Sequence, residues 1–455
     1  MKKQAPIIWL KNPRAIFTAN SQDANGGVLV QGSEIIELVP AGSLPKQAYD
    51  SYVDCSQWVI IPGLINTHHH FYQTLTRAVP GALNKPLFPW LQFLYKIWAN
   101  LDDKMLKVAT RIAAMELMLS GTTTVGDHHY VFPEKLANAI DIQVEEIKSL
   151  GCRAVLTRGS MSLGKSQGGL PPDHIVQSPQ TILDDSKRLI DTYHERSEGA
   201  QIQIALAPCS PFSVSTDLMK ETAVLATQEQ VLIHTHLAET EDENSFCLRE
   251  YGMRPLDYLE DCGWLRPGTW LAHGIHFNDE EVSRLGTNKI GIAHCPSSNM
   301  LLSSGICRTM ELAQAGCTIA LAVDGSASND CSNMIQEVRQ SLLQQRLRYS
   351  ATDITAERVL GWATLGGANL YQRNDIGQIA VGKQADLAFF SLDEMRFSGI
   401  GDPIAGLVTS GAHQVGKLMV AGNWLIEDPL HYLALQDETL ALHRQAAKML
   451  QASIN

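Results

Sequence analysis

The sequence predicts an α/β protein: a (β/α)8 barrel of the TIM type, joined to a small β-sandwich that both chain termini build. Three observations lead to this fold. Short strand-like segments fill both ends of the chain, whereas the middle alternates apolar strands with helical stretches. In addition, histidines and an aspartate fall at the ends of the middle strands, which is where active sites form in barrels of this class.

The two ends of the chain carry short strands separated by Gly, Pro, Asn and Asp. We expect strands at 7–10, 15–17, 27–30, 35–39 and 58–60, and again at 386–390 and 416–424. Because both ends share this character and flank a different middle, we expect one β-sandwich domain from residues 1–60 and 375–430. The barrel would then occupy residues 61–374, and residues 431–455 would form a C-terminal helical extension.

The middle of the chain reads as eight strand–helix units. The predicted strands end at His70, His129, Arg158, Cys209, His236, His273, His294 and Asp324. Helical patterns such as 106–119 and 332–346 lie between or after them. Eight such units make a closed barrel the economical arrangement. The alternative is an open doubly wound sheet, but no Gly-x-Gly-x-x-Gly opens a helix after the first strand.

Composition and charge exclude several kinds of partner. The formal net charge is -12, whereas binding to a phosphate backbone normally needs clustered Lys and Arg, so we expect no nucleic acid. No apolar run approaches the roughly 20 residues of a membrane helix, so we expect no membrane. The first apolar run breaks at Lys11 before a signal-peptide core can form. The nine cysteines include no Cys-x-x-Cys, as is typical of reduced thiols in a cytoplasmic protein.

The first barrel strand is predicted to end in three histidines, His68, His69 and His70. Alternate residues of an extended strand share a face, so His68 and His70 can meet one metal ion while His69 points to the other face. His236 adds a third imidazole, and Asp324 adds a carboxylate that would be costly to bury unpaired. This set suits one divalent ion, with Zn2+ preferred over Fe2+.

Two neighbours of this set are expected to play no part in binding metal. His234 lies two residues before His236, deeper in the strand, and we expect a structural role for it. A lysine at the end of the fourth strand could bridge a second ion, but Cys209 stands there, so we expect a single ion.

Glu239 follows His236 by three residues, which brings its carboxylate over the same end of the barrel. A carboxylate beside an activated water can take its proton and pass it to a leaving nitrogen, so we expect general acid–base catalysis by Glu239. The alternative is an ordinary residue of a helix N-terminus. His273 is expected to polarise a substrate carbonyl or to hold the attacking water. For His294 a structural hydrogen bond and a substrate contact both stay open, and His276 is expected in a loop.

Taken in chain order, these motifs resemble those of the amidohydrolase superfamily, and specifically its mononuclear deaminase branch. The matching segments are PGLINTHHH (62–70), HLAE (236–239), HG (273–274), HCP (294–296) and VDG (323–325). The resemblance implies the β-sandwich built from both termini, acid–base work by Glu239 and orientation of the water or carbonyl by His273. It implies metal binding by His68, His70, His236 and Asp324.

Within that branch, several segments look most like those of 8-oxoguanine deaminases. They are NTHHHFYQTLTR (66–77), FPWL (88–91), DHHYVFP (127–133), APCSPFS (207–213) and DGSASND (324–330). The resemblance implies hydrolytic deamination of a free oxidised purine base, in which a metal-bound hydroxide turns 8-oxoguanine into urate and ammonia. Asp324 would accept the water proton, and Glu239 would deliver protons to the ring nitrogen and the departing amine.

Several side chains are candidates for binding the purine. Gln73 offers a donor and an acceptor to its amide-like edge, and Trp90 or Tyr130 could stack on its face. Trp90 could equally belong to the core, and Arg158 could pair with a substrate carbonyl or with an internal carboxylate. Cys209 stands where the resemblance leads us to expect an arginine in guanine deaminases, which argues against plain guanine as the main substrate.

Other activities remain open on the sequence alone. Guanine, isoxanthopterin and triazine-type aminohydrolases share the metal constellation and differ in pocket side chains. A remote alternative is a catalytically inactive scaffold, although every expected ligand is present here. Exposed helix faces around a barrel commonly associate, so we expect a homo-oligomer, a dimer, that acts on a small-molecule purine.

Overall fold

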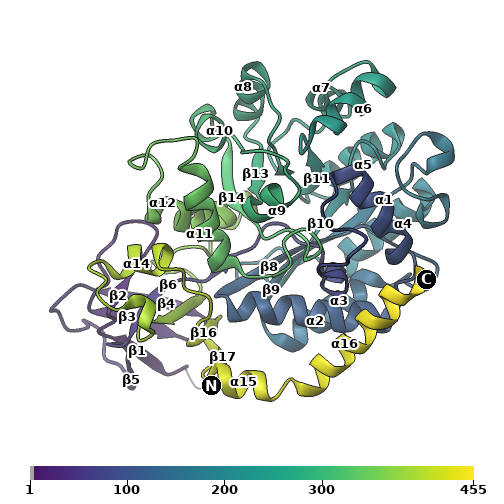
Figure 1. The fold of residues 1–455 in the computed structure, drawn as a ribbon. Helices are drawn as coiled ribbons and strands as arrows, with labels where there is room; N and C mark the ends of the chain where they lie inside the picture. The colour runs from purple at the N-terminus through teal and green to yellow at the C-terminus, as the bar shows by residue number, and fades with distance from the viewer. Residues whose placement is uncertain (1–4, 455) are drawn as a thin grey trace.

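The computed structural model describes residues 5–454, and its largest sheet has eight strands that are all parallel to their neighbours (Figure 1). The strands run in chain order around the sheet. They are β7 (Leu64–Ile65), β8 (Thr122–His129), β9 (Arg153–Ser160), β10 (Ile202–Pro208), β11 (Ile233–Leu237), β12 (Thr269–His273), β13 (Gly291–His294) and β14 (Thr318–Leu321).

The first and last strands meet through the segments that follow them, which closes the sheet. The Thr67 N–H donates to the Leu321 carbonyl (3.2 Å), and the Asp324 N–H donates to the His68 carbonyl (3.1 Å). Inside, small and branched side chains from successive strands pack around Trp270. The predicted (β/α)8 barrel is thus confirmed.

Helices cover the outside of the barrel (Figure 1). The α-helices between and after the barrel strands are α1 (Leu87–Trp98), α2 (Asp103–Leu119), α3 (Ala139–Leu150), α4 (Pro179–Tyr193), α5 (Thr216–Gln228), α6 (Glu241–Tyr251), α7 (Pro255–Asp261), α8 (Asp279–Thr287), α9 (Pro296–Leu301), α10 (Thr309–Ala315), α11 (Met334–Gln345), α12 (Ala356–Gly361) and α13 (Gly367–Leu370). Shorter turns are η1 (Phe71–Thr76), η2 (Lys165–Gln167), η3 (Asp173–Ile175) and the π-helical η4 (Trp362–Gly366).

Two barrel strands end several residues earlier than predicted. β7 stops at Ile65 and β14 at Leu321, so the histidine triplet and Asp324 lie on irregular backbone beyond the strands. The cause is that the side chains of Asn66 and Thr67 form hydrogen bonds with backbone groups that would otherwise pair between the two strands. Asn66 Oδ1 accepts from the Val323 N–H (2.9 Å), and the Thr67 hydroxyl donates to the Leu321 carbonyl (2.9 Å).

Strands from both ends of the chain form two further sheets. One has the order β4-β3-β1-β5, and the other, β17-β16-β15-β6-β2, joins the two ends directly. Side chains of both sheets share one core that includes Leu10, Val30, Ile60 and Phe389. The strands are β1 (Ile7–Lys11), β2 (Ala15–Ile16), β3 (Gly27–Gln31), β4 (Glu34–Val39), β5 (Ser51–Asp54), β6 (Trp58–Pro62), β15 (Leu387–Ser391), β16 (Lys417–Val420) and β17 (Asn423–Ile426).

The terminal sheets differ from the sequence prediction in two places. The segment expected as one strand at 416–424 is a hairpin, because Ala421 (φ 49°) and Gly422 (φ 73°) take the left-handed conformations of a tight turn between β16 and β17. β5 was not predicted, since its alternation is weak and most of it is exposed. The division of the chain at residues 60, 374 and 430 stays a prediction.

After β15 come η5 (Met395–Phe397) and α14 (Pro403–Thr409), and after the terminal sheets the chain returns along the barrel as α15 (Pro429–Ala434) and α16 (Asp437–Gln451), ending in η6 (Ala452–Ile454). Figure 1 shows α16, in yellow, running beside α2.

Within residues 5–454, no helix has the length and hydropathy needed to cross a membrane. The nine cysteines are free thiols.

Candidate metal and catalytic site

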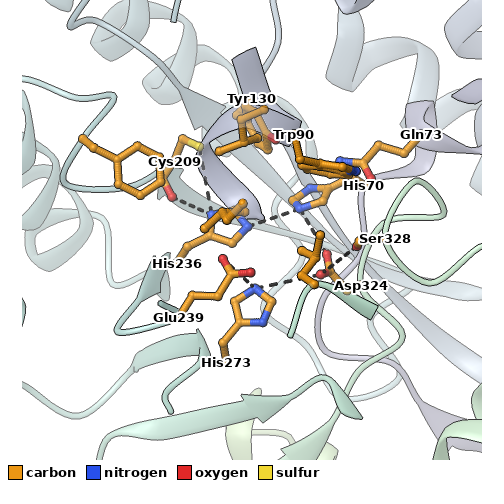
Figure 2. A pocket seen from close by; sticks show the side chains of 14 residues that line it. His70, Gln73, Trp90, Tyr130, Cys209, His236, Glu239, His273, Asp324 and Ser328 are labelled. Atoms are coloured by element: carbon orange, nitrogen blue, oxygen red, sulfur yellow. Dashed lines mark hydrogen bonds and ion pairs between the residues drawn. The ribbon is translucent and has the colours of Figure 1, made fainter. Parts of the chain in front are cut away.

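Four predicted ligands, His68, His70, His236 and Asp324, meet at the C-terminal end of the barrel strands, and Figure 2 shows the last three of them. Nε2 of His68 and Nε2 of His70 each lie 3.3 Å from Asp324 Oδ1, and Nε2 of His236 lies 3.2 Å from Nε2 of His70. All four side chains are buried. Burial lowers the pKa of each of the three imidazoles, so the rings are neutral at pH 7.

The hydrogen bonds of His70 and His236 show that this cluster fits a cation. Nδ1 of His70 lies 2.7 Å from the His128 carbonyl oxygen, and Nδ1 of His236 lies 2.6 Å from the Cys209 carbonyl oxygen. A carbonyl oxygen only accepts, so each Nδ1 carries the hydrogen and each Nε2 keeps its lone pair. Two lone pairs 3.2 Å apart, beside a carboxylate, repel one another unless a positive ion lies among them. The residues therefore fit a metal ion.

Two further histidines adjoin the cluster, and neither was predicted as part of it. The ligand atoms of His68, His70, His128 and His236 all lie within 4.8 Å of one another. His128 stacks on His236 with ring centroids 4.8 Å apart and directs Nε2 to the Ala207 carbonyl (2.8 Å). His234 contacts His68 through its ring nitrogen. His128 could have been found from the sequence, because it occupies a strand end like the other histidines.

Glu239 and His273 stand beside the carboxylate of the cluster. Nε2 of His273 lies 3.5 Å from Glu239 Oε2 and 3.9 Å from Asp324 Oδ2. Burial raises the pKa of Glu239 to about 7, although the neighbouring His273 acts in the opposite direction. The carboxyl is thus poised to gain and lose a proton near neutral pH, as a general acid–base group must.

Asp324 lies in a different electrostatic setting. Burial disfavours its charge, but hydrogen bonds from two serine hydroxyls favour the anion. The Ser298 hydroxyl donates to its Oδ2 (2.6 Å), as does the Ser328 hydroxyl (3.2 Å). Asp324 is therefore an anion while Glu239 exchanges its proton, and the two carboxyl groups are suited to different work.

The backbone is strained at three points of the site. Ala238 (φ 54°), His273 (φ 69°) and Asp324 (φ 63°) adopt the left-handed conformation that side chains with a Cβ rarely take. Two N–H groups, of Ile275 and His276, donate to the Ala238 carbonyl (2.9 Å each), and the Glu239 N–H donates to Glu243 Oε2 (3.0 Å). These bonds hold the turn that carries Glu239 over the cluster.

A cavity opens over the cluster, and four of the predicted substrate residues lie in its wall: Gln73, Trp90, Tyr130 and Cys209 (Figure 2). Gln73 Oε1 accepts from the Ala327 N–H (3.2 Å). Gly325 packs so closely that a Cβ there would meet Gln73 Oε1 at 2.0 Å. The remaining wall residues, which were not predicted, are Leu87, Leu91, Phe212, Leu302 and Ser328.

The structure does not bring Arg158 to the cavity. Its Nε donates to Asp185 Oδ2 (2.6 Å), its Nη2 donates to Gln177 Oε1 (2.9 Å), and its guanidinium lies over the Phe132 ring. This corrects the expectation of a substrate contact in favour of the internal carboxylate, because the side chain points outward from β9 to α4.

Three more histidines, His69, His276 and His294, make structural contacts away from the cluster. His294 is buried and lies 3.3 Å from the amide nitrogen of Gln345, outside the cavity wall. His276 lies in a loop, with Nε2 2.8 Å from the Ser304 carbonyl. His69 points away from the cluster, with Nε2 2.8 Å from the Ser332 hydroxyl.

Comparisons with known proteins show the family to which the chain belongs. The amidohydrolase family matches residues 59–425. An 8-oxoguanine deaminase of Pseudomonas aeruginosa is 56% identical over 98% of this chain and 99% of that protein. An isoxanthopterin deaminase of an unknown prokaryote is 34% identical over 93% of both. Among solved structures, a zinc complex of atrazine chlorohydrolase from Arthrobacter aurescens TC1 is 28% identical, with a TM-score of 0.89 over 96% of this chain and 100% of that one. The chain therefore belongs to the amidohydrolase family.

Proposed function

We propose that this protein is a metal-dependent aminohydrolase that converts 8-oxoguanine and water to urate and ammonia. The observation that carries the proposal is a single cavity. In it, Glu239 and the cluster that contains His70, His236 and Asp324 face a wall that includes Gln73. The 56% identical 8-oxoguanine deaminase supports the choice of substrate. In the reaction, the bond from C2 to the amino nitrogen breaks, and an oxygen from water takes its place.

The metal ion would be held by His68, His70, His236 and Asp324. When bound, it would supply the Lewis acidity that makes water a good nucleophile near pH 7. We infer a single Zn2+, because three imidazoles and one carboxylate suit zinc, and Cys209 stands where a bridging lysine would be needed for a second ion. Metal analysis should find about one equivalent of zinc, and stripping it with a chelator should abolish ammonia release until zinc is restored.

Glu239 moves the protons. Its carboxylate takes one proton of the attacking water and delivers it to the ring nitrogen beside the reacting carbon, and it delivers the second proton of that water to the amine, which leaves as ammonia. A pKa of about 7 suits both directions of transfer. His273 steadies the oxygen that gains charge at the reacting carbon, since its Nε2 lies between Glu239 and Asp324. Asp324 accepts the second proton of the water from the oxygen and passes it on for transfer to the departing amine.

The cavity wall would bind the purine. Gln73 would meet the amide-like edge of the base, and the ring of Trp90 or Tyr130 would stack on its face, since all three side chains line the cavity. Cys209 provides a small, apolar surface where an arginine would favour guanine. We therefore expect 8-oxoguanine to be preferred over guanine.

Steady-state ammonia release from 8-oxoguanine, guanine, isoxanthopterin and hydroxyatrazine tests this assignment. We expect kcat/KM to be highest for 8-oxoguanine. If kcat/KM were higher for one of the other three compounds, that compound would be assigned as the substrate instead. An inactive scaffold would bind less than about half an equivalent of metal and release no ammonia after metal is added.

We also propose that the protein is a homodimer. Leu430, Leu435, Leu442 and Met449 are exposed on or next to α15 and α16, which supports association through these helices. Light scattering during gel filtration tests this, and a mass of one chain would contradict it.

A further inference from the structure

His68 is held differently from the other two imidazoles of the cluster. Nδ1 of His70 and Nδ1 of His236 face backbone carbonyls, whereas Nδ1 of His68 lies 2.8 Å from Nε2 of another side chain, His234. Nδ1 of His234 in turn lies 2.9 Å from the Trp270 carbonyl oxygen. The orientation of His68 therefore depends on a side chain that a mutation can replace.

The Trp270 carbonyl determines where the hydrogens of this relay lie. Because a carbonyl oxygen only accepts, the hydrogen of His234 is on Nδ1. The other nitrogen of a neutral imidazole has a lone pair, so His234 Nε2 accepts and His68 Nδ1 donates in the 2.8 Å contact. His68 Nε2 is left with a lone pair. It has no hydrogen-bond partner in the described chain, although Asp324 Oδ1 lies 3.3 Å away.

The surroundings of His234 keep the ring neutral and fixed. It is buried and stacks on the Trp270 indole, with centroids 4.3 Å apart and planes 10° apart. The imidazoles of His68, His128 and His236 lie around it, and no carboxylate of residues 5–454 is within ion-pair distance. A buried imidazolium without an anionic partner would be costly. The Trp270 indole N–H also donates to the Thr67 carbonyl (3.2 Å), next to His68.

We propose that His234 is a positioning residue that sets the tautomer of His68, so that His68 presents Nε2 to the metal ion as a lone pair. The proposal rests on the metal binding proposed above. Without an acceptor at position 234, the hydrogen of His68 can move to Nε2. The nitrogen that faces Asp324 then becomes a hydrogen-bond donor, and the site loses one ligand.

Two substitutions at position 234 separate this role from simple packing. His234→Leu removes the acceptor, whereas His234→Gln keeps it: an amide oxygen can accept from His68 and its NH2 group can donate to the Trp270 carbonyl. His129→Leu is the matched control, because His129 is also a buried histidine at a strand end and its ring nitrogens have no hydrogen-bond partner in the described chain.

The measurement is zinc affinity by competition with a chromophoric chelator, on metal-stripped protein without substrate. Loss of a hydrogen-bond partner of a metal-binding histidine typically weakens metal affinity by roughly 10- to 100-fold, which is the change expected for His234→Leu. His234→Gln should restore most of the affinity, and His129→Leu should leave it unchanged. A folded Leu variant with unaltered affinity would overturn the proposal, as would a Gln variant as weak as the Leu variant.

Nitrogen-15 NMR of histidine-labelled, metal-free protein gives a second, direct test. This test uses the natural protein without metal, so it still gives an answer if the Leu variant does not fold or if the natural protein binds no zinc. His68 and His234 should both carry hydrogen on Nδ1 and none on Nε2, and a hydrogen on Nε2 of His68 would overturn the proposal. Neither measurement uses substrate, so failure of the proposed reaction shows separately, as missing ammonia release.

Discussion

Glu239 is the residue on which turnover depends most directly. It is 4% exposed and faces His273 across 3.5 Å, so its carboxyl is close to the reacting atoms and shielded from solvent. Replacing it by Gln keeps the shape and removes the proton-transfer group. We expect Glu239→Gln to bind as much zinc as the natural protein and to release ammonia roughly 10²- to 10⁴-fold more slowly.

Glu241→Gln provides the control for this variant. The same change is made two residues further along the chain, where the side chain is largely exposed and pairs with His276. Its turnover should match that of the natural protein. If Glu239→Gln retained near-full activity while its zinc content was normal, Glu239 would lose its assigned role.

The raised pKa of Glu239 also makes a prediction about stability. Burial raises the pKa from 4.5 to about 7, so the folded protein holds a proton that the unfolded chain releases between these values. The contribution of Glu239 to stability is therefore greatest below pH 4.5 and is lost as the pH rises through 7. Gln resembles the protonated acid at every pH. The free energy of unfolding of Glu239→Gln, relative to that of the natural protein, should therefore rise as the pH increases.

Urea unfolding of both metal-free proteins at pH 5 and pH 8.5 measures this difference. A pKa change of this size corresponds to at most about 3 kcal/mol in favour of the Gln variant at pH 8.5 relative to pH 5. Buried acids whose pKa does not depend on Glu239, such as Asp127, occur in both proteins and cancel in the comparison. An equal difference in unfolding free energy at both pH values would contradict the shifted pKa.

At the scale of the elements, the sequence predicted most barrel strands because parallel strands buried on both faces appear as apolar runs. β8 and β12 end at the predicted residues. The early ends of β7 and β14 could not be predicted, since they result from Asn66 and Thr67 binding backbone groups more than 250 residues away. The histidine motif still indicated a metal site, because the convergence of His68 and His70 does not require regular strand geometry.

The limits of the site prediction have a similar cause. The polar residues at strand ends were accessible to sequence reasoning because the barrel gathers those ends at one mouth. Leu302 and Phe212 reach the cavity through loop paths that have no periodic signal. The relay through His234 depends on which way one ring nitrogen faces, and residue spacing contains no such information.

One ion pair connects two elements that are far apart in sequence. Arg153, the first residue of β9, makes bidentate contact with Asp386, just before β15, at 2.7 and 3.1 Å. Asp386 Oδ1 also accepts from the Ala421 N–H (2.7 Å), and both charged side chains are buried. Asp386→Ala leaves a buried guanidinium without its anion, so we expect it to lower the free energy of unfolding by about 3–5 kcal/mol.

The matched control is Asp257→Ala, which removes one of the two carboxylate partners of Arg284, the other being Glu260, on the outer helices. Asp257 is 42% exposed on its side chain, and surface pairs of this kind contribute about 0–1 kcal/mol. Urea titrations of the two variants and the natural protein give both values. Similar small losses for both variants would show that the Arg153–Asp386 pair does not join the terminal sheet to the barrel energetically.

At the scale of the whole molecule, the C-terminal helix supports the wall of the cavity. α16 leaves the terminal sheets, runs beside α2 and reaches η1, the turn that contains Gln73 (Figure 1). Gln451 Nε2 donates to the Leu75 carbonyl (2.8 Å), and His443 Nε2 lies 3.1 Å from the Thr74 hydroxyl. The last turns of the chain thus hold a segment near its beginning, beside the proposed purine contact.

This arrangement predicts an effect on substrate binding from residues that lie outside the cavity. The double variant Gln451→Ala, His443→Ala removes both bonds to η1 and leaves the buried Leu450 in place. Gln73 then loses some of its fixed position, so KM for 8-oxoguanine should rise roughly 3- to 10-fold. We expect kcat to change little, since Glu239 follows another strand and His68 and His70 keep their own hydrogen bonds, to His234 and to the His128 carbonyl. Gln445→Ala, on the exposed face of α16, is the control and should leave KM unchanged. If kcat fell by a similar factor and KM did not change, α16 would affect the catalytic step and not the wall that binds the purine.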